Sequence, residues 1–217
     1  GMKLYYSAYI PEEYPIVRPI SYFLPEGNRQ KGMEFLREAI DKAVFARPEA
    51  TYFLATINLY YEENFQAAKE LYWSLVEQYP DNGYYRRLYM TTLSHLREYN
   101  NMVWFYHETM NHWETSSLPD HPVMEYELTY WLGRAQYYLA DYISSKESFV
   151  NALEIGSRLK NKENRDLFTL SAFFAGKVSE ELNSIDSAVK YYKITANQAA
   201  MPEAIKRARV RLRELDG

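Results

Sequence analysis

The sequence contains no cysteine, so disulfide bonds, thiol nucleophiles and cysteine-ligated zinc sites are excluded. Its 217 residues include only 8 glycines, too few and too scattered for a glycine-rich loop around a phosphate. No apolar run approaches the length that crosses a bilayer, so no membrane span is predicted. The net charge of −4 at pH 7 provides no basic surface for nucleic acid, and no nucleic-acid partner is predicted.

Aromatic residues are abundant, at 17% of the chain, and 22 of them are tyrosines. Tyrosine buries a large ring while its hydroxyl reaches water or a partner, so it suits half-buried seams and contact surfaces. The remaining composition, 47% hydrophobic and 25% charged, is that of a folded globular chain. The length corresponds to about one domain or one repeat array.

Apolar residues recur at helical spacing from about Gln30 onward, with no sustained strand-like alternation. Proline, asparagine and aspartate stand at the breaks, where they end one helix or cap the next. The spacing predicts helices at 31–46, 50–62, 65–79, 84–97, 100–113, 122–139, 143–157, 164–182, 185–199 and 202–215. An all-α fold is therefore expected.

The predicted helices pair off in a fixed register. Equivalent positions in four first helices are occupied by Thr56, Met90, Gly133 and Gly176. Each lies nine residues before the first aligned residue of its second helix, at Phe65, Tyr99, Tyr142 and Ile185. Successive pairs are separated by 34, 43 and 43 residues. Constant spacing inside each pair, with variable spacing between pairs, is typical of a repeated antiparallel helix hairpin.

Small residues and rings are expected to meet across each seam. Gly133 and Gly176 leave space for a ring to approach from the paired helix. The rings that fill the layer between hairpins are Tyr72, Tyr106, Phe149 and Tyr192. One hairpin cannot bury this seam alone, whereas stacked copies share a continuous core.

The pattern resembles the tetratricopeptide repeat family over about residues 30–200. The matching motifs are Leu132-Gly133 and Ala175-Gly176 for the family's Leu-Gly step, Ala68/Tyr72, Ser145/Phe149 and Ala188/Tyr192 for its Ala-x3-Phe step, and Pro80 for its closing proline. The family's leading tryptophan is replaced by Tyr52, Arg86, Thr129 and Ala172. The resemblance implies an all-α, right-handed superhelical solenoid of antiparallel helix pairs, whose first helices line a concave groove.

The N-terminal part of the chain departs from the repeat. An extra second helix precedes the others, because Met33, Leu36, Ile40 and Ala43 repeat the pattern of Phe65, Ala68, Tyr72 and Leu75 at a distance of 32 residues. Its partner helix is expected to be short, irregular or missing, since the chain upstream is interrupted by Pro11, Pro15, Pro19 and Pro25. We expect a Pro-interrupted, partly helical segment at 1–29, a repeat array at 30–200 and a capping helix at 201–217.

Helical geometry selects the candidate groove residues, because positions about 100° apart can be assigned to the side opposite the seam. They are Phe53, Ile57, Tyr60, Tyr61, Arg87, Thr91, His95, Tyr130, Arg134, Tyr137, Tyr138, Phe173 and Lys177, with Ser94, Glu180 and Glu181 at the remaining equivalent positions. Rings with a line of cations suit a peptide that carries apolar anchors and a carboxylate or two. Equally, the rings can fill gaps between helices or contact the N-terminal segment.

Some members of the family clamp the terminal carboxylates of a chaperone with a lysine and an asparagine four residues apart. The equivalent pairs here are Phe53/Ile57, Arg87/Thr91, Tyr130/Arg134 and Phe173/Lys177. None matches, so that activity is not predicted.

No catalytic, cofactor-binding or metal-binding residues are predicted. His107 and His112 are five residues apart, whereas a zinc-peptidase helix places two histidines four apart on one face. The C-terminal helix carries Lys206, Arg207, Arg209, Arg211 and Arg213. Its charged face is interpreted as the solvated side of a cap, with binding of a phosphate or an acidic partner as the alternative.

Three functions remain open from the sequence. The first is a non-enzymatic scaffold that binds a protein or peptide in the groove. The second is a regulatory module that responds to a ligand or peptide, and the third is an all-helical enzyme. A cytoplasmic location is expected if Met2 is the natural start, and an exported one if a signal has been removed. The oligomeric state is not predicted.

Overall fold

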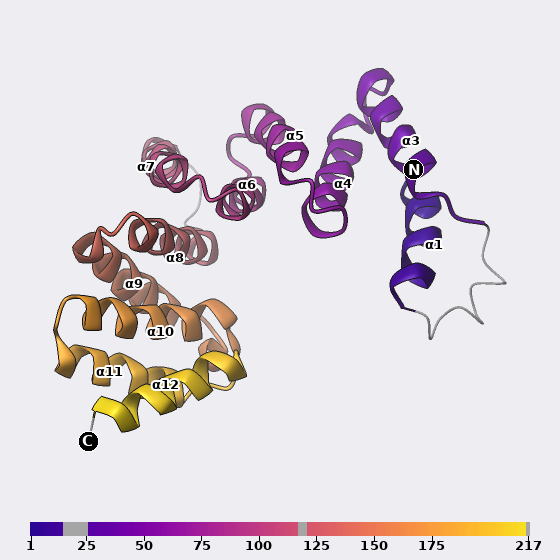
Figure 1. Cartoon of the computed structure of the whole chain (residues 1–217). Coiled ribbons are helices and arrows are strands. Elements are labelled where there is room, and N and C mark those ends of the chain that lie inside the picture. The colour runs from indigo at the N-terminus through magenta and orange to yellow at the C-terminus, as the bar shows by residue number, and fades with distance from the viewer. Residues whose placement is uncertain (15–25, 117–120, 216–217) are drawn as a thin grey trace. The chain divides into compact units, whose positions relative to one another are not determined.

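The computed structural model describes residues 1–14, 26–116 and 121–215, and the regular structure in these ranges is helical throughout (Figure 1). The helices are α1 (Met2–Glu13), α3 (Arg29–Lys42), α4 (Arg47–Tyr60), α5 (Phe65–Gln78), α6 (Gly83–His95), α7 (Tyr99–Thr115), α8 (Pro122–Tyr138), α9 (Tyr142–Ser157), the short 3-10 helix η2 (Lys162–Asn164), α10 (Asp166–Glu181), α11 (Ile185–Ala196) and α12 (Pro202–Leu215). Every helix that the spacing predicts is present, with ends displaced by at most about four residues, as expected for helix termini. The predicted fold class, an all-α array of antiparallel helix pairs, is confirmed.

The chain forms two compact units, Gly1–Pro80 (unit 1) and Asp81–Gly217 (unit 2). In unit 1, α1 packs against α3, α3 against α4, and α4 against α5. In unit 2, the hairpins are α6/α7, α8/α9 and α10/α11, and α12 packs against α11 and α10. Figure 1 shows the helices of unit 2 from α8 to α11 lying side by side. The expected division at residues 29/30 and 200/201 stays a prediction.

The N-terminal segment contains the helix α1, which has 12 residues and includes Pro11. Pro11 lies in the last turn of α1, so the one backbone hydrogen bond that it cannot donate is lost at the end of the helix, and the Tyr14 amide closes the helix by donating to the Ile10 carbonyl at 2.9 Å. Gly32 of α3 allows the two helices to approach, because a Cβ there would lie 2.8 Å from the Cβ of Tyr5. Pro15, Pro19 and Pro25 lie outside the described residues.

The turns inside the hairpins repeat one backbone conformation. Glu63, Arg97, Ala140 and Asn183 each stand two residues before a second helix, and each has a left-handed φ between 51° and 60°. This conformation commonly ends a helix by letting amides beyond it reach the last free carbonyls. Side chains of Asn64 and Asp141 then cap the following helices by accepting from the amides of Ala67 and Ser144.

The predicted seam is confirmed in three hairpins. A Cβ on Gly133 would lie 3.0 Å from the Phe149 ring, and one on Gly176 would lie 2.7 Å from the Tyr192 ring. In unit 1, the hydroxyl of Thr56 lies 3.0 Å from that of Tyr72. All three rings are buried, so each small residue holds a paired ring in the core.

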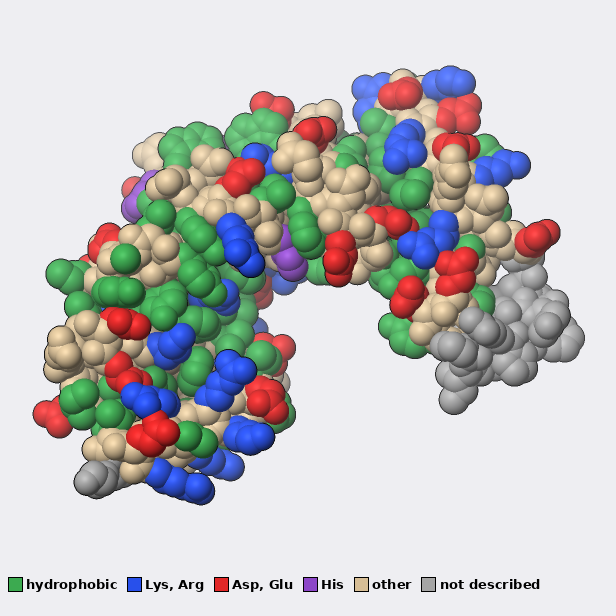
Figure 2. Space-filling model, viewed as in Figure 1, with side chains coloured by type: hydrophobic (Ala, Val, Ile, Leu, Met, Phe, Trp, Pro, Cys, Tyr) green, Lys and Arg blue, Asp and Glu red, His purple; other side chains and the backbone are tan. Residues whose placement is uncertain are grey.

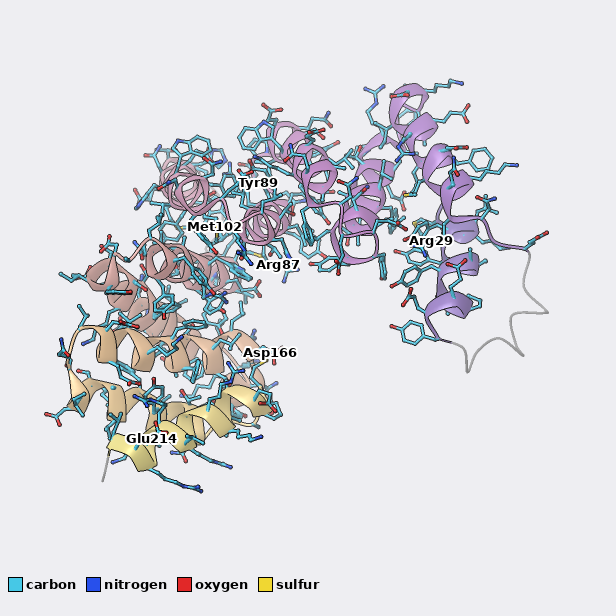
Figure 3. All side chains as sticks on the ribbon, in the orientation of Figure 1. Arg29, Arg87, Tyr89, Met102, Asp166 and Glu214 are labelled. Atoms are coloured by element: carbon cyan, nitrogen blue, oxygen red, sulfur yellow. The ribbon has the colours of Figure 1, made fainter. Side chains whose placement is uncertain are left out.

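The α6/α7 hairpin packs differently, because Met90 fills the space that glycine leaves elsewhere. Met90 and Met102 are fully buried, and Tyr89 meets Phe105 edge-on at 4.7 Å (Figure 3). Tyr106 remains half-buried, with its hydroxyl 3.2 Å from Thr129 of α8. At the position of the family's tryptophan, buried Arg86 donates to Glu108 at 2.5 Å and Thr109 at 2.9 Å.

Candidate protein-binding face

In unit 2, helices α6, α8, α10 and α12 are neighbours, since each contacts the next in this series. The second helices α7, α9 and α11 pack behind them as the partners in each hairpin. We call the surface that these four helices present the first-helix face of unit 2. It contains the predicted groove residues between Arg87 and Lys177, and it also contains α12, which the sequence predicted only as a cap.

Arg87 of α6 is engaged within the chain. It donates to Glu127 of α8 at 3.0 Å, and its guanidinium carbon lies 4.7 Å from the centre of the Tyr84 ring (Figure 3). Thr91 donates its hydroxyl proton to the Arg87 carbonyl at 3.0 Å, and His95 is exposed. The positive charge of Arg87 is therefore balanced by a glutamate from the next first helix.

Arg134 of α8 lies among aromatic rings. Its guanidinium carbon is 4.6 Å from the centre of the Phe174 ring and 5.3 Å from that of Tyr138. It donates to the phenol oxygens of Tyr130 at 2.9 Å and Tyr138 at 3.1 Å, while its buried Nε has no hydrogen-bond partner. Burial raises the pKa of Tyr130, so that phenol stays neutral. Arg134 therefore keeps a positive charge that no carboxylate of the described residues pairs with.

The neighbouring predicted residues divide into a buried and an accessible group. Tyr130 is fully buried, and Tyr137 is half-buried against Phe174. Tyr138 is 48% exposed and stacks on Tyr99 at 4.8 Å. Lys177 of α10 lies 5.0 Å from the centre of the Tyr137 ring. Tyr138 is consequently the exposed ring in this part of the face, and Arg134 and Lys177 are the half-buried cations beside it.

A cavity of about 640 Å³ lies between α10, α11 and α12. Its apolar lining comes from Phe173, Tyr192 and Val210, and the charged groups around it are Lys177, Glu180, Glu181, Glu203, Lys206, Arg207, Arg211 and Glu214. The sequence placed Phe173 and Lys177 in a groove, but it did not bring α12 to the same site. The apolar stripe of α12, on which Ile205 and Ala208 are buried, was the signal that this helix packs against the last hairpin.

The predicted groove residues of unit 1 are largely covered by the chain itself. Ile57 is fully buried in the core, and Phe53 packs against the same cluster. Tyr61 meets Tyr9 of α1 edge-on at 4.8 Å and Tyr6 at 5.5 Å. Thus Tyr61 contacts the N-terminal segment, which was one of the two interpretations left open. Tyr60, by contrast, is 51% exposed.

A network of hydrogen bonds and ion pairs joins α1 to Arg29 and Glu62, next to these tyrosines. Tyr5 donates to Glu62 at 2.5 Å, while Arg29 donates to Glu62 at 2.7 Å and to Glu12 at 3.0 Å (Figure 3). Burial alone would raise the pKa of Glu62, but the hydrogen bonds from Tyr5 and Arg29 outweigh it and hold that pKa below its ordinary value. Unit 1 therefore closes its aromatic face with its own first helix.

Three of the thirteen predicted residues do not offer a free side chain, because Ile57, Tyr130 and Phe173 are at most 8% exposed. Phe173 still contributes to the cavity. In the described part of the chain, no group of three or more acidic or histidine side chains is placed to hold a metal ion. None of the helices in those ranges combines the length and apolarity that crossing a bilayer requires.

The chain matches no protein-family model and no curated protein sequence. Among solved structures it is similar to BtubC (BKLC) from P. vanneervenii, with a TM-score of 0.65 and 15% sequence identity over 86% of this chain and 79% of that one. It is also similar to MamA (MSR-1 C2), with a TM-score of 0.49 and 15% identity over 92% and 97% of the two chains. At this level of identity, the likeness to BtubC concerns the fold alone.

Proposed function

We propose that this protein is a non-enzymatic interaction scaffold that binds a protein or peptide on the first-helix face of unit 2. The observation that carries the proposal is Arg134, a shielded cation that lies on four aromatic rings and pairs with no carboxylate of the described residues. Shielding a charge from water costs free energy that a partner's carboxylate would offset. Arginine is also the side chain best suited to hold a carboxylate.

Other shielded arginines of the chain support this interpretation by contrast. Arg29 pairs with Glu62, Arg86 with Glu108 and Arg87 with Glu127. Arg134 differs in that its hydrogen bonds go to two phenols, and the Tyr138 ring beside it is half exposed. An accessible ring next to an arginine is the kind of pair that dominates binding energy at protein interfaces.

The test is to compare protein capture by two double variants of the full chain. Tyr138→Ala with Arg134→Gln removes the ring and the charge from the first-helix face. Ile143→Ala with Arg158→Gln instead removes an exposed apolar side chain from α9 and an exposed charge from the residue that follows it. We expect the first variant to lose at least about tenfold of the captured partner, as quantified by mass spectrometry, and the second to retain it.

Folding must be checked in the same samples. Arg134→Gln takes a donor from the buried Tyr130 hydroxyl, which costs about 1–3 kcal/mol. Tyr138→Ala alone avoids this cost, so a loss of capture by that single variant at an unchanged melting temperature supports the proposal. Equal capture by the wild type and by both Tyr138 variants would contradict it.

A further inference from the structure

Two connections between helices of unit 2 lie together at one end of α9 to α12. Residues 158–165 join α9 to α10, and residues 197–201 join α11 to α12 (Figure 1). The two connections are in contact, because the amides of Ala199 and Ala200 donate to the Glu163 carbonyl at 3.0 and 3.3 Å. We call this end of the four helices the connection end. It comprises the two connections and the helix halves that adjoin them, residues 150–173 and 189–209.

The connection end is basic, although the whole chain has a net charge of −4. Its nine basic residues are Arg158, Lys160, Lys162, Arg165, Lys190, Lys193, Lys206, Arg207 and Arg209. Its four acidic residues are Glu154, Glu163, Asp166 and Glu203. The net charge of the connection end is therefore +5, and it is still +3 without Lys206 and Arg207, which also border the cavity.

The sign of this charge belongs to one end of the helices. The opposite halves of the same four helices, residues 142–149, 174–188 and 210–215, contain four basic and five acidic residues. Their net charge is −1, so the basic residues are not spread evenly along α9 to α12. Figure 2 shows several basic side chains, in blue, at the end of unit 2 where α12 lies.

The chain does not use these positive charges itself. None of the nine basic side chains makes an ion pair within the described residues. Arg165 and Arg209 donate to the backbone carbonyls of Lys160 and Ala196, which carry no net charge. Eight of the nine are exposed, and Arg165 is half-buried. The charges are therefore accessible to a partner.

The connection end offers charge without apolar anchors. All of its residues are described, and none of its large apolar side chains is exposed. Protein interfaces usually depend on a few large side chains that enter pockets of the partner. Proteins that bind single-stranded nucleic acid stack its bases on accessible rings, whereas Phe168, Phe173, Tyr191 and Tyr192 are all buried here. A broad basic surface without anchors fits a broad layer of negative charge.

We propose that the connection end of unit 2 is a peripheral membrane-binding surface that rests on the headgroups of anionic phospholipids. The negative surface potential of such a membrane attracts clusters of basic residues, and each basic residue near the surface strengthens the binding. The attraction extends over about one Debye length, roughly 10 Å at 0.1 M salt, so side chains from one loop and two helices act together.

This inference goes beyond the proposed function. The connection end lies at the ends of the helices, whereas the proposed partner binds beside Arg134 and Tyr138 on the first-helix face. Headgroup binding needs neither of these side chains, and protein capture needs no membrane. Either conclusion can therefore hold without the other.

The experiment is cosedimentation of the full chain with lipid vesicles. One set of vesicles contains phosphatidylcholine alone, and the other also contains about 30% phosphatidylserine. At about 50 mM salt, we expect the partition coefficient for the phosphatidylserine vesicles to be at least about tenfold higher. Raising the salt to about 300 mM should remove most of this difference, because the basic side chains are exposed.

Matched double variants locate the surface. Lys160→Gln with Lys162→Gln removes two exposed charges from the α9–α10 connection. Lys146→Gln with Arg213→Gln removes the same charge from the opposite halves of α9 and α12. The first variant should bind phosphatidylserine vesicles at least about tenfold more weakly, and the second should remain within about twofold of the wild type. Lys160→Arg with Lys162→Arg keeps the charge and should bind as the wild type does. The melting temperatures of all three should be unchanged.

Three outcomes would overturn the inference. The first is equal binding to vesicles with and without phosphatidylserine, or binding that persists unchanged at about 300 mM salt, since charge would then not be the cause. The second is equal binding by the wild type and the Lys160→Gln/Lys162→Gln variant. The third is binding to a DNA duplex of about twenty base pairs without binding to phosphatidylserine vesicles, because the partner would then be a nucleic acid. The proposed function is tested separately, by protein capture with Tyr138→Ala.

Discussion

Arg29 of unit 1 and Arg134 of unit 2 each lie over a tyrosine ring, but they differ in whether a carboxylate of the described residues pairs with them. Arg29 of unit 1 is 5.1 Å from the centre of the Tyr9 ring and pairs with Glu62 and Glu12. Arg134 of unit 2 is 5.3 Å from the centre of the Tyr138 ring and donates to phenols. In unit 1, the arginine and the tyrosine belong to a network in which the chain's own helix α1 covers the aromatic face. In unit 2, the equivalent arginine and tyrosine leave the aromatic face able to receive a carboxylate.

The largest effect is expected from the seam that supports Arg134. Phe149 is fully buried, and it stacks at 5.4 Å on Phe174, the ring beneath the guanidinium. Phe149→Ala should lower the free energy of unfolding by about 3–5 kcal/mol, through lost burial and the cavity left behind. Urea unfolding followed by circular dichroism measures this loss. Ile143→Ala on the same helix is the control, since that side chain is 66% exposed and its loss should cost at most about 0.5 kcal/mol.

The comparison of the two arginines is tested directly by replacing each with methionine. Arg29→Met removes charged hydrogen bonds to Glu62 and should cost about 2 kcal/mol. Arg134→Met should cost about 1 kcal/mol or less, because the loss of a donor to Tyr130 is offset by removing an unpaired, shielded charge. Thermal unfolding of both variants measures which substitution lowers the stability more. An equal or larger loss for Arg134→Met would mean that its charge is already satisfied in the free protein.

Acid should loosen the two terminal helices before the middle of unit 2. The pKa values of Glu62 and Glu180 are both held below the ordinary value of 4.5 in the folded protein. A lowered folded pKa contributes stability that is present above the ordinary pKa and is lost as pH falls through the folded one. Hydrogen exchange in α1 and α12 should therefore accelerate below about pH 4.5 relative to α8 and α9.

The variant Glu62→Gln isolates the contribution of unit 1 to this acid response. It cannot titrate, so the acid response of α1 should disappear while that of α12 persists. Glu63→Gln, at an adjacent and exposed position, is the matched control and should leave both responses unchanged. An α1 that still loosens in acid without a carboxylate at position 62 would show that another group holds it.

The smallest effect is expected at the hairpin turns. Ala140 has a left-handed φ of 60°, a conformation that disfavours a residue with a Cβ. Ala140→Gly relieves this but makes the unfolded chain more flexible, so the net gain should be about 0.5 kcal/mol, or a rise of about 1–2 °C in Tm. Glu63→Gly is the equivalent change in unit 1. A lower Tm for Ala140→Gly would mean that the turn is not strained.

Helix positions and hairpin pairing could be predicted because they depend on short-range information. The nine-residue spacing from Gly133 and Gly176 to their second helices fixes which small residue meets which ring, and the contacts with Phe149 and Tyr192 confirm it. The bounds of the first helix could not be predicted, because the prolines upstream of Met33 do not by themselves show which part of the segment is helical. Pro11 stands in the final turn of α1, so the amide hydrogen bond that it cannot donate is lost only at the end of the helix.

The candidate site could be predicted only in outline. Helical geometry assigned Arg134, Tyr138 and Lys177 to one face, and in the structure the half-buried Arg134 lies beside the rings of Tyr138 and Phe174, while the half-buried Lys177 also lies beside Phe174. The same geometry assigned Ile57 and Tyr130 to that face, although both are buried, because the angle around a helix does not reveal where a neighbouring helix lies. The cavity was missed for the same reason, since its α12 wall joins the face only through packing.

The amino-acid sequence by itself determined the helices, their pairing and the residues of the seam, because each depends on spacings shorter than a hairpin. Only the tertiary structure decided which charges are satisfied. The hydrogen-bonded pairs Arg29–Glu62, Arg87–Glu127 and Arg211–Glu180 are separated by 33, 40 and 31 residues in the sequence. Arg134 is reached by no carboxylate of the described chain. Such pairings depend on how hairpins stack, and the free energy of a charge depends on what lies within a few ångströms of it in space.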